Sequence, residues 1–152
     1  MKTNKIKKVL VALDYDVTSK KVAEEGYSLA QSMNGETILL HVISELPVYY
    51  SESNYTHEFK DDLLGDLNKT TQTFLDKAKK HLGDDAVQTV LKEGEIADTI
   101  LKTAKEMDVD IIVMGSHSRK WLESIMLGSQ SDDILTNSPI PVLIVPIKKK
   151  DV

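Results

Sequence analysis

The chain has 152 residues, a formal net charge of −5 and no cysteine. This length is typical of one hydrophobic core, and we expect residues 1–152 to form a single domain. The missing cysteines exclude disulfides, thiol catalysis and cysteine metal sites, and the acidic balance argues against nucleic acid as a partner. The apolar run near the N-terminus, Val9 to Leu13, is too short for a signal peptide or a membrane span. We therefore expect a cytoplasmic protein that does not enter a membrane.

Five apolar segments predict the strands of a sheet. Four are continuous and rich in Val, Ile and Leu, as expected of parallel strands buried on both faces. The fifth carries Gln88 and Thr89, which predicts a place at the edge of the sheet. In chain order the predicted strands are Val9 to Leu13, Thr37 to Ile43, the weaker Ala86 to Leu91, Ile111 to Met114 and Val142 to Val145.

Four helical patterns separate these strands. Asn34-Gly35 and Gly83 offer left-handed stops after the first two helices, and Pro139 and Pro141 separate the last helix from the final strand. The alternation of strands and helices predicts an α/β protein with a doubly wound parallel sheet. The first predicted helix is capped by Thr18 or Ser19. The other three are predicted over Leu63 to Leu82, over Ile96 to Met107, and from about Trp121 to Asn137.

The loop after the first strand is the first candidate site. It reads Ala12-Leu13-Asp14-Tyr15-Asp16, and ligands of doubly wound sheets bind outside the carboxyl ends of strands. Asp14 is suited to bond a ribose or to help hold a metal on a phosphate. Taken alone, Asp14 is more typical of a turn residue or a helix cap.

The loop after Met114 is the second candidate site. Glycine lets a backbone approach a phosphate closely, and a helix N-terminus favours an anion. Gly115 is also typical of a tight turn. Gly128 is also typical of a glycine that allows close packing within a helix. If the two loops are neighbours, Val42 can pack on a base while the phosphates are surrounded by Gly115, Ser118, Gly128, Ser129 and Ser131.

The sequence offers little for catalysis. Neither G-x-x-x-x-G-K-[ST] nor G-x-G-x-x-G occurs, which argues against classical P-loop and dinucleotide sites. His117 can donate to a phosphate or act as a base, but no local nucleophile or orienting carboxylate completes a hydrolytic set. Arg119 and Lys120 either neutralise phosphate charge or are solvated loop cations. His41 is expected to be a satisfied core or rim histidine, and no spacing resembles a metal site.

The chain resembles the universal stress protein family over nearly its whole length. The resemblance rests on Val9-Leu10-Val11-Ala12-Leu13-Asp14, on Leu39-Leu40-His41-Val42, on Gly94 to Leu101, and on the segment from Asp110 through Gly128-Ser129 to Pro146. It implies a sheet of order 3-2-1-4-5, of the adenine-nucleotide alpha-hydrolase type. It also implies a homodimer built through the last strand, Val142 to Val145, and a role in stress response that involves a protein client.

Members of that family that bind ATP carry the pattern G-x2-G-x9-G-[ST], and others lack it. Here the pattern reads Gly115-x2-Ser118-x9-Gly128-Ser129, so the spacing is intact and Ser118 replaces the middle glycine. If that position needs a positive φ, Ser118 is strained by about 1–2 kcal/mol, whereas a serine hydroxyl can itself bond a phosphate. The resemblance implies an ATP site, with or without Mg²⁺, at Ala12, Leu13, Asp14, Val42, Met114, Gly115, His117, Ser118, Arg119, Gly128, Ser129, Gln130 and Ser131.

Other functions stay open on the sequence. The missing middle glycine also fits a family member that binds no nucleotide and acts as a dimeric protein-interaction module. A nucleotidyl transferase would need an acid–base set that the sequence does not supply, so at most slow ATP hydrolysis is expected. The segment from Ser44 to His57 contains three tyrosines and is either a surface loop or a segment that docks a partner.

Overall fold

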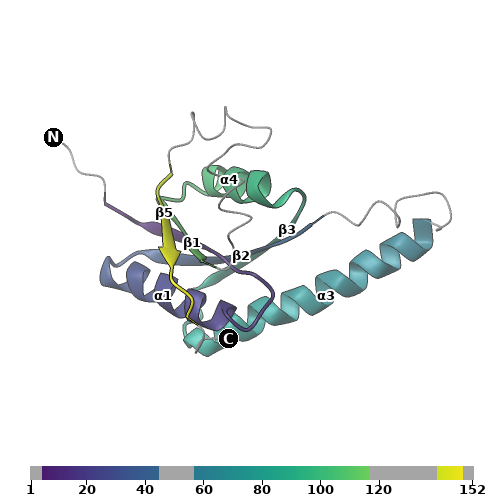
Figure 1. Ribbon diagram of the computed structural model, residues 1–152, viewed down its shortest axis with the longest axis horizontal. Coiled ribbons are helices and arrows are strands. Elements are labelled where there is room, and N and C mark those ends of the chain that lie inside the picture. Colours follow the sequence, from purple (N-terminus) through teal and green to yellow (C-terminus); the bar gives the residue numbers. More distant parts are fainter. Residues whose placement is uncertain (1–4, 45–56, 117–139, 149–152) are drawn as a thin grey trace.

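The computed structural model describes residues 5–44, 57–116 and 140–148 (Figure 1). Within these ranges a central sheet is flanked by helices, and strands and helices alternate along the chain up to the fourth strand. The elements are β1 (Lys8–Ala12), α1 (Ser19–Ser32), β2 (Glu36–Ile43), α3 (His57–Leu82), β3 (Gln88–Glu93), α4 (Ile96–Glu106), β4 (Ile111–Gly115) and β5 (Val142–Val145).

The sheet has five strands in the order β3-β2-β1-β4-β5, and every neighbouring pair is parallel. The central strand is β1, where Leu10 lies opposite Ile38 of β2 on one side and Ile112 of β4 on the other. The predicted fold class and the order 3-2-1-4-5 are confirmed. The predicted edge position of the third strand is also confirmed, and β5 ends the sheet on the other side.

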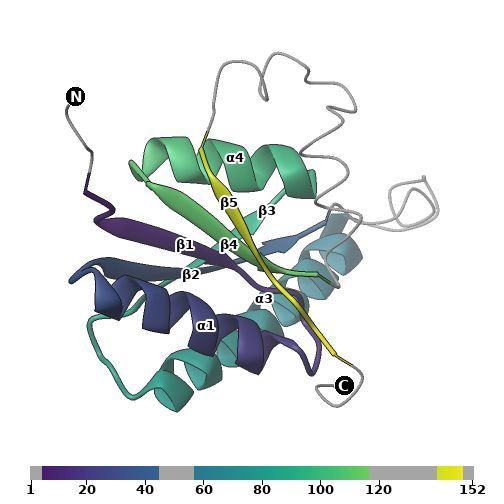
Figure 2. The same cartoon turned by 60° about the vertical axis from the view of Figure 1, so that its left-hand side comes forward.

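Two hydrophobic cores lie on the two faces of the sheet. Helices α1 and α3 cover one face and α4 covers the other (Figure 2). Successive residues of a strand point to opposite faces, so Leu10 and Ala12 pack beneath α4 while Val9 and Val11 pack beneath α1 and α3. Continuous apolar runs such as that of β1 are therefore explained by burial on both faces.

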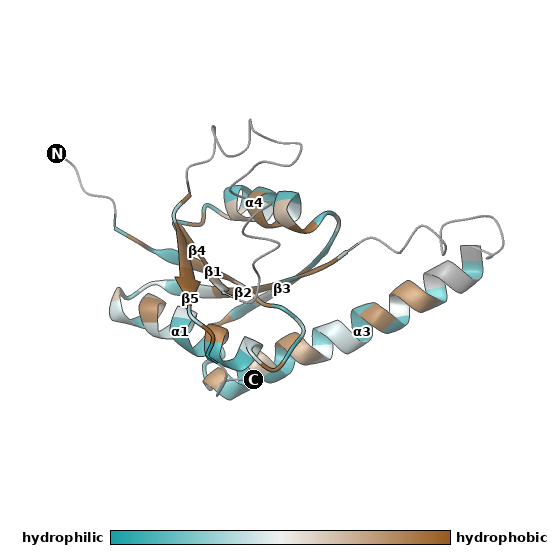
Figure 3. Cartoon of the chain, viewed as in Figure 1, coloured by the Kyte–Doolittle hydropathy of each residue, from teal (hydrophilic) through white to brown (hydrophobic). Residues whose placement is uncertain are grey.

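Hydropathy follows this layering (Figure 3). The central strands are mostly hydrophobic, whereas the helices mix apolar and polar residues. The long helix α3 extends well past the end of the sheet (Figure 1). No helix within the described ranges is long and apolar enough to cross a lipid bilayer.

The third strand lies two residues later than predicted, over Gln88–Glu93 in place of Ala86 to Leu91. Asp84 explains the shift, because its side-chain oxygen accepts a hydrogen bond from the backbone N–H of Ala86 at 2.9 Å. Its carbonyl oxygen accepts one from the N–H of Val87 at 3.2 Å. These bonds hold the start of the predicted strand in a turn.

The cap of α1 lies at a predicted position but lacks the side-chain bond expected of a cap. Thr18 occupies the N-cap position but its side chain makes no capping bond. The carboxylate of Asp16 instead accepts from the Thr18 backbone N–H at 2.8 Å and from its hydroxyl at 2.5 Å. At the other end, Asn34 has a φ of 54° and the N–H of Gly35 bonds the Ala30 carbonyl at 2.8 Å, which is a Schellman stop. The predicted left-handed stop is confirmed, with Asn34 as the left-handed residue.

Candidate functional site

The loops that follow β1 and β4 leave the same edge of the sheet. Strands β1 and β4 are parallel neighbours, with Val11 opposite Val113 near their carboxyl ends. Helix α1, which follows β1, packs on one face, and α4, which precedes β4, packs on the other. The two candidate loops therefore begin side by side, at a point where the winding of the sheet reverses.

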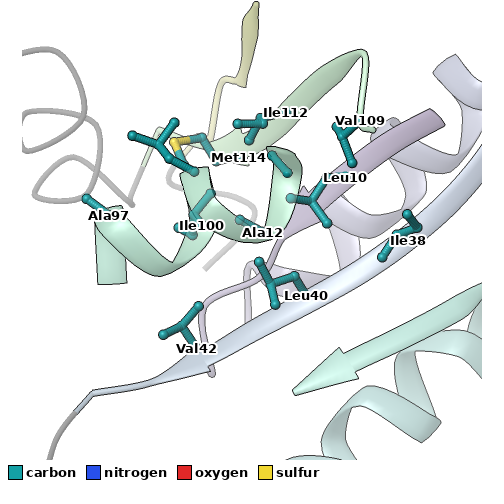
Figure 4. Packing of buried hydrophobic residues seen from close by; sticks show 12 residues of the cluster. Leu10, Ala12, Ile38, Leu40, Val42, Ala97, Ile100, Val109, Ile112 and Met114 are labelled. Atoms are coloured by element: carbon teal, nitrogen blue, oxygen red, sulfur yellow. The ribbon is translucent and has the colours of Figure 1, made fainter. Parts of the chain in front are cut away.

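Three of the predicted site residues come together on the α4 face. Ala12, Val42 and Met114 belong to β1, β2 and β4, and all three are buried in the same hydrophobic cluster with Ala97 at the start of α4 (Figure 4). Leu13 is buried as well, but in the cluster on the opposite face. The structure thus joins Ala12, Val42 and Met114 and separates them from Leu13.

The loop after β1 begins with backbone and side-chain bonds to β2. The N–H of Leu13 donates to the Leu40 carbonyl at 2.8 Å. The Leu13 carbonyl lies 2.6 Å from Nδ1 of His41, and since a carbonyl oxygen only accepts, Nδ1 must be the donor. These two bonds fix the residue that directly precedes Asp14. His41 is partly buried, so the expectation of a satisfied rim histidine is confirmed.

Asp14 is partly buried at the end of this segment. Asp14 does not have the helix-cap role that sequence reasoning weighed for it, because the N-cap of α1 is Thr18, which is held by the carboxylate of Asp16. Asp14 thus lies at the carboxyl end of the central strand without being the cap of the following helix. The carboxylate type and the position suit a bond to a sugar hydroxyl or to a cation.

Gly115 ends β4 and is buried. A Cβ on this residue would lie 2.9 Å from Cγ2 of Val22 in α1, and its φ is not positive. Beyond it, the N–H of Ser116 bonds the Val145 carbonyl at 2.9 Å, and the Ser116 hydroxyl accepts from the N–H of Ile147 at 2.8 Å. Gly115 therefore admits α1 close to the sheet, a packing role that the sequence reasoning did not identify.

Several predicted residues lie outside the described ranges, and the roles given to them stay predictions. The same holds for the predicted helix from Trp121 to Asn137 and for most of the segment between Ser44 and His57. Within the described ranges, no group of three or more His, Asp or Glu side chains could hold a metal ion. The site residues concerned are His117, Ser118, Arg119, Gly128, Ser129, Gln130 and Ser131.

Comparison with known proteins places these observations in a family. Residues 5–146 match the model of the universal stress protein family. The chain is 36% identical over 144 residues to universal stress protein YxiE of Bacillus subtilis, an alignment that covers 91% of this chain and 97% of the relative.

Solved structures agree in fold. The structure of MJ0577, a protein of Methanocaldococcus jannaschii, superposes with a TM-score of 0.70 at 30% identity and covers 96% of this chain and 99% of that one. A universal stress protein solved in complex with cAMP superposes with a TM-score of 0.63 at 18% identity, covering 94% and 98% of the two chains.

Proposed function

The chain belongs to the universal stress protein family, and we propose that it binds an adenine nucleotide at the carboxyl ends of β1, β2 and β4. The observation that carries the proposal is the convergence there of Ala12, Val42 and Met114 beside the loop that bears Asp14. An adenine base and its ribose need an apolar surface beside a carboxylate. The base buries its ring against the apolar side chains, and the carboxylate accepts hydrogen bonds from the ribose hydroxyls.

Structural neighbours support the choice of adenine. One neighbour was solved with cAMP, and an Arabidopsis family protein with a TM-score of 0.55 and 19% identity was solved with AMP bound. The two ligands share adenine, ribose and one phosphate. For this chain we propose ATP, because Gly115, Gly128 and Ser129 keep the spacing of the family's phosphate pattern.

In this proposal the nucleotide is a regulatory ligand of a cytoplasmic stress-response protein. Asp14 binds the ribose or a Mg²⁺ ion on the phosphates, Val42 and Met114 lie beneath the base, and residues 115–131 hold the phosphates. No acid–base pair is assigned, so hydrolysis is slow or absent, and the nucleotide state acts through contacts with a protein client.

The proposal includes a homodimer formed through β5. This strand ends the sheet, so one row of its backbone N–H and C=O groups has no strand beside it in the described part of the chain. Its Val142, Leu143 and Ile144 side chains are not buried, and Leu143 is 38% exposed. An apolar edge of this kind is suited to pairing with a second copy across a two-fold axis.

Calorimetric titration with ATP–Mg²⁺ tests the nucleotide site. The matched pair of variants is Asp14→Ala and Asp85→Ala, since Asp85 is an exposed aspartate in the turn before β3. We expect saturable binding in the wild type and in Asp85→Ala, and at least about tenfold weaker binding in Asp14→Ala because a charged hydrogen bond is lost. Gly115 is unsuitable as the test position, because a larger residue there would meet Val22.

The alternative is a dimeric interaction module that binds no nucleotide. The replacement of the family glycine by Ser118 favours it. Absence of ATP binding by a folded wild-type protein up to millimolar concentration, together with no rise in its Tm on adding ATP–Mg²⁺, would select this alternative.

A further inference from the structure

A groove lies between the β1–α1 loop and α3, against the face of the sheet opposite Ala12, Val42 and Met114. It consists of a hollow of about 570 Å³ and an adjoining one of about 330 Å³. The two hollows share Asp16, Val17, Phe74 and Lys77. We refer to both together as the α1–α3 groove.

Aromatic and apolar side chains form the wall of the α1–α3 groove. The rings of Tyr15 and Phe74 lie with centroids 4.7 Å apart and planes inclined by 45°, and His41 stands edge-on to Phe74 at 6.0 Å. Tyr15 is 55% exposed and Val17 is 68% exposed. Exposed rings of this kind offer a stacking surface to a planar ligand.

Lysines outnumber carboxylates in the lining of the groove. Lys20 of α1 and Lys77 of α3 line it, and within the described ranges neither makes an ion pair. The acidic residue in the lining is Asp16, whose carboxylate is engaged by the backbone N–H and hydroxyl of Thr18. The groove therefore presents two cations beside an apolar wall, which favours an anionic ligand.

The size of the groove favours a small molecule. Along α3 the lining runs from Thr70 to His81, about 16 Å at the helical rise of about 1.5 Å per residue. Sites for small ligands occupy about 300–1,000 Å³, which matches the hollows, whereas a stable protein interface needs about 800 Å² on each partner.

We propose that the α1–α3 groove binds a small aromatic acid, with its ring against Tyr15 and Phe74 and its acid group paired with Lys77, which lines both hollows. The residues that line this groove differ from those of the proposed nucleotide site, although Tyr15 directly follows Asp14 in the chain. Binding in this groove would give the protein a second ligand besides the nucleotide.

Titration of the full chain with 2-naphthoate, followed by amide NMR signals, tests the proposal. We expect saturable shifts at Tyr15, Val17, Phe74 and Lys77. Reversing the charge in Lys77→Glu is expected to weaken binding about fivefold. Lys80→Glu is the matched control, because Lys80 is an exposed lysine of the same helix outside the groove lining, and its affinity should equal that of the wild type.

Tyr15→Ala provides an independent variant, since Tyr15 is largely exposed and its loss leaves the core intact. It too should bind 2-naphthoate more weakly, with urea unfolding used to confirm that each variant is folded. Equal affinity in Lys77→Glu and Lys80→Glu would overturn the proposal. So would the absence of saturation at millimolar 2-naphthoate, shifts centred on Ala12 and Met114, or binding of an acidic peptide without binding of the aromatic acid.

Discussion

The imidazole Nδ1 of His41 lies 2.6 Å from the carbonyl oxygen of Leu13, which ties β2 to the first residue beyond β1. Because the carbonyl only accepts, Nδ1 carries the proton and the neutral ring has Nε2 as its acceptor. The bond orients the backbone directly before Asp14. A substitution at His41 should therefore alter the backbone of the loop that bears Asp14.

Replacement of His41 separates the hydrogen bond from the packing of the ring. His41→Asn keeps a side-chain N–H donor, whereas His41→Leu keeps apolar bulk and loses the donor. We expect His41→Leu to lower the free energy of unfolding by about 1 kcal/mol relative to His41→Asn, measured by urea unfolding. Equal losses in both variants would show that the ring contacts with Phe74, and not the bond to Leu13, stabilise this end of the sheet.

Two helical glycines make a matched test of packing. A Cβ on Gly26 of α1 would overlap Cγ2 of Val11 in β1, whereas a Cβ on Gly65 of α3 meets nothing within 4 Å. Valine is stiff about χ1, so Gly26→Ala should lower the free energy of unfolding by about 1–3 kcal/mol.

Gly65→Ala should raise the free energy of unfolding by up to about 1 kcal/mol, because alanine is the better helix former. The double variant Gly26→Ala, Val11→Ala should recover part of the packing strain caused by Gly26→Ala alone. Chemical denaturation of the three variants measures these values. A neutral or stabilising Gly26→Ala would show that α1 can move away from β1 at no cost.

The hydrogen bond between Tyr27 and Asp84 makes the free energy of unfolding depend on pH. The Tyr27 hydroxyl donates to the Asp84 carboxylate at 2.7 Å, and this bond, followed by the one from the Ala86 N–H, lowers the pKa of Asp84. Because the pKa of Asp84 is lowered in the folded state, its ionised carboxylate stabilises the fold above the ordinary aspartate pKa of about 4. This stabilisation is lost as the pH falls through the pKa that Asp84 has in the folded protein. The comparison of wild type with Asp84→Asn in urea at pH 7 and pH 3 should show a larger advantage for the wild type at pH 7 than at pH 3.

The same hydrogen bond raises the pKa of Tyr27. The protonated Tyr27 hydroxyl therefore stabilises the fold below the ordinary tyrosine pKa of about 10. This stabilisation is lost as the pH rises through the pKa that Tyr27 has in the folded protein. Tyr27→Phe should abolish the dependence at high pH and reduce the one at low pH, where the bond from the Ala86 N–H to Asp84 remains. NMR titration of the Asp84 carboxyl carbon should show its pKa rising in that variant. An unchanged Asp84 pKa in Tyr27→Phe would contradict this assignment.

Two exposed leucines test the dimer proposed through β5. Leu143 of β5 is 38% exposed and Leu67 of α3 is 40% exposed. Leu143→Lys should convert the dimer to a monomer, because a charge at a paired edge disfavours strand pairing, while Leu67→Lys should leave the dimer intact. Sedimentation equilibrium gives the masses. A wild-type monomer, or a dimer in Leu143→Lys, would refute pairing through this strand.

The sequence was informative about the fold because its signals were local and periodic. The final strand, Val142 to Val145, was predicted with its observed bounds, since the prolines at 139 and 141 precede a short apolar run. The third strand was misplaced because Asp84 forms a turn with Ala86 that apolar patterning does not reveal. The cap of α1 was predicted at Thr18 or Ser19, and Thr18 does occupy it, but the bond that the Asp16 carboxylate accepts from Thr18 was not foreseen.

The candidate site was predictable in its position but not in its packing. Doubly wound topology made the ends of β1 and β4 neighbours, so the place of Asp14 and Met114 followed from the order of elements. The role of Gly115 did not follow, because its contact with Val22 joins residues distant in sequence. The same is true of the α1–α3 groove, where Tyr15 meets Phe74 only after α3 has packed against the sheet.

Methyl NMR of the protein during titration with ATP–Mg²⁺ tests the nucleotide site most directly, because the two faces of the sheet carry different methyl groups. We expect saturable shifts of the Ala12, Val42 and Met114 methyls on the α4 face, with those of Val22 and Leu75 on the opposite face almost unmoved. Saturation with the largest shifts at Val22 and Leu75, or no shift at millimolar ATP, would contradict it.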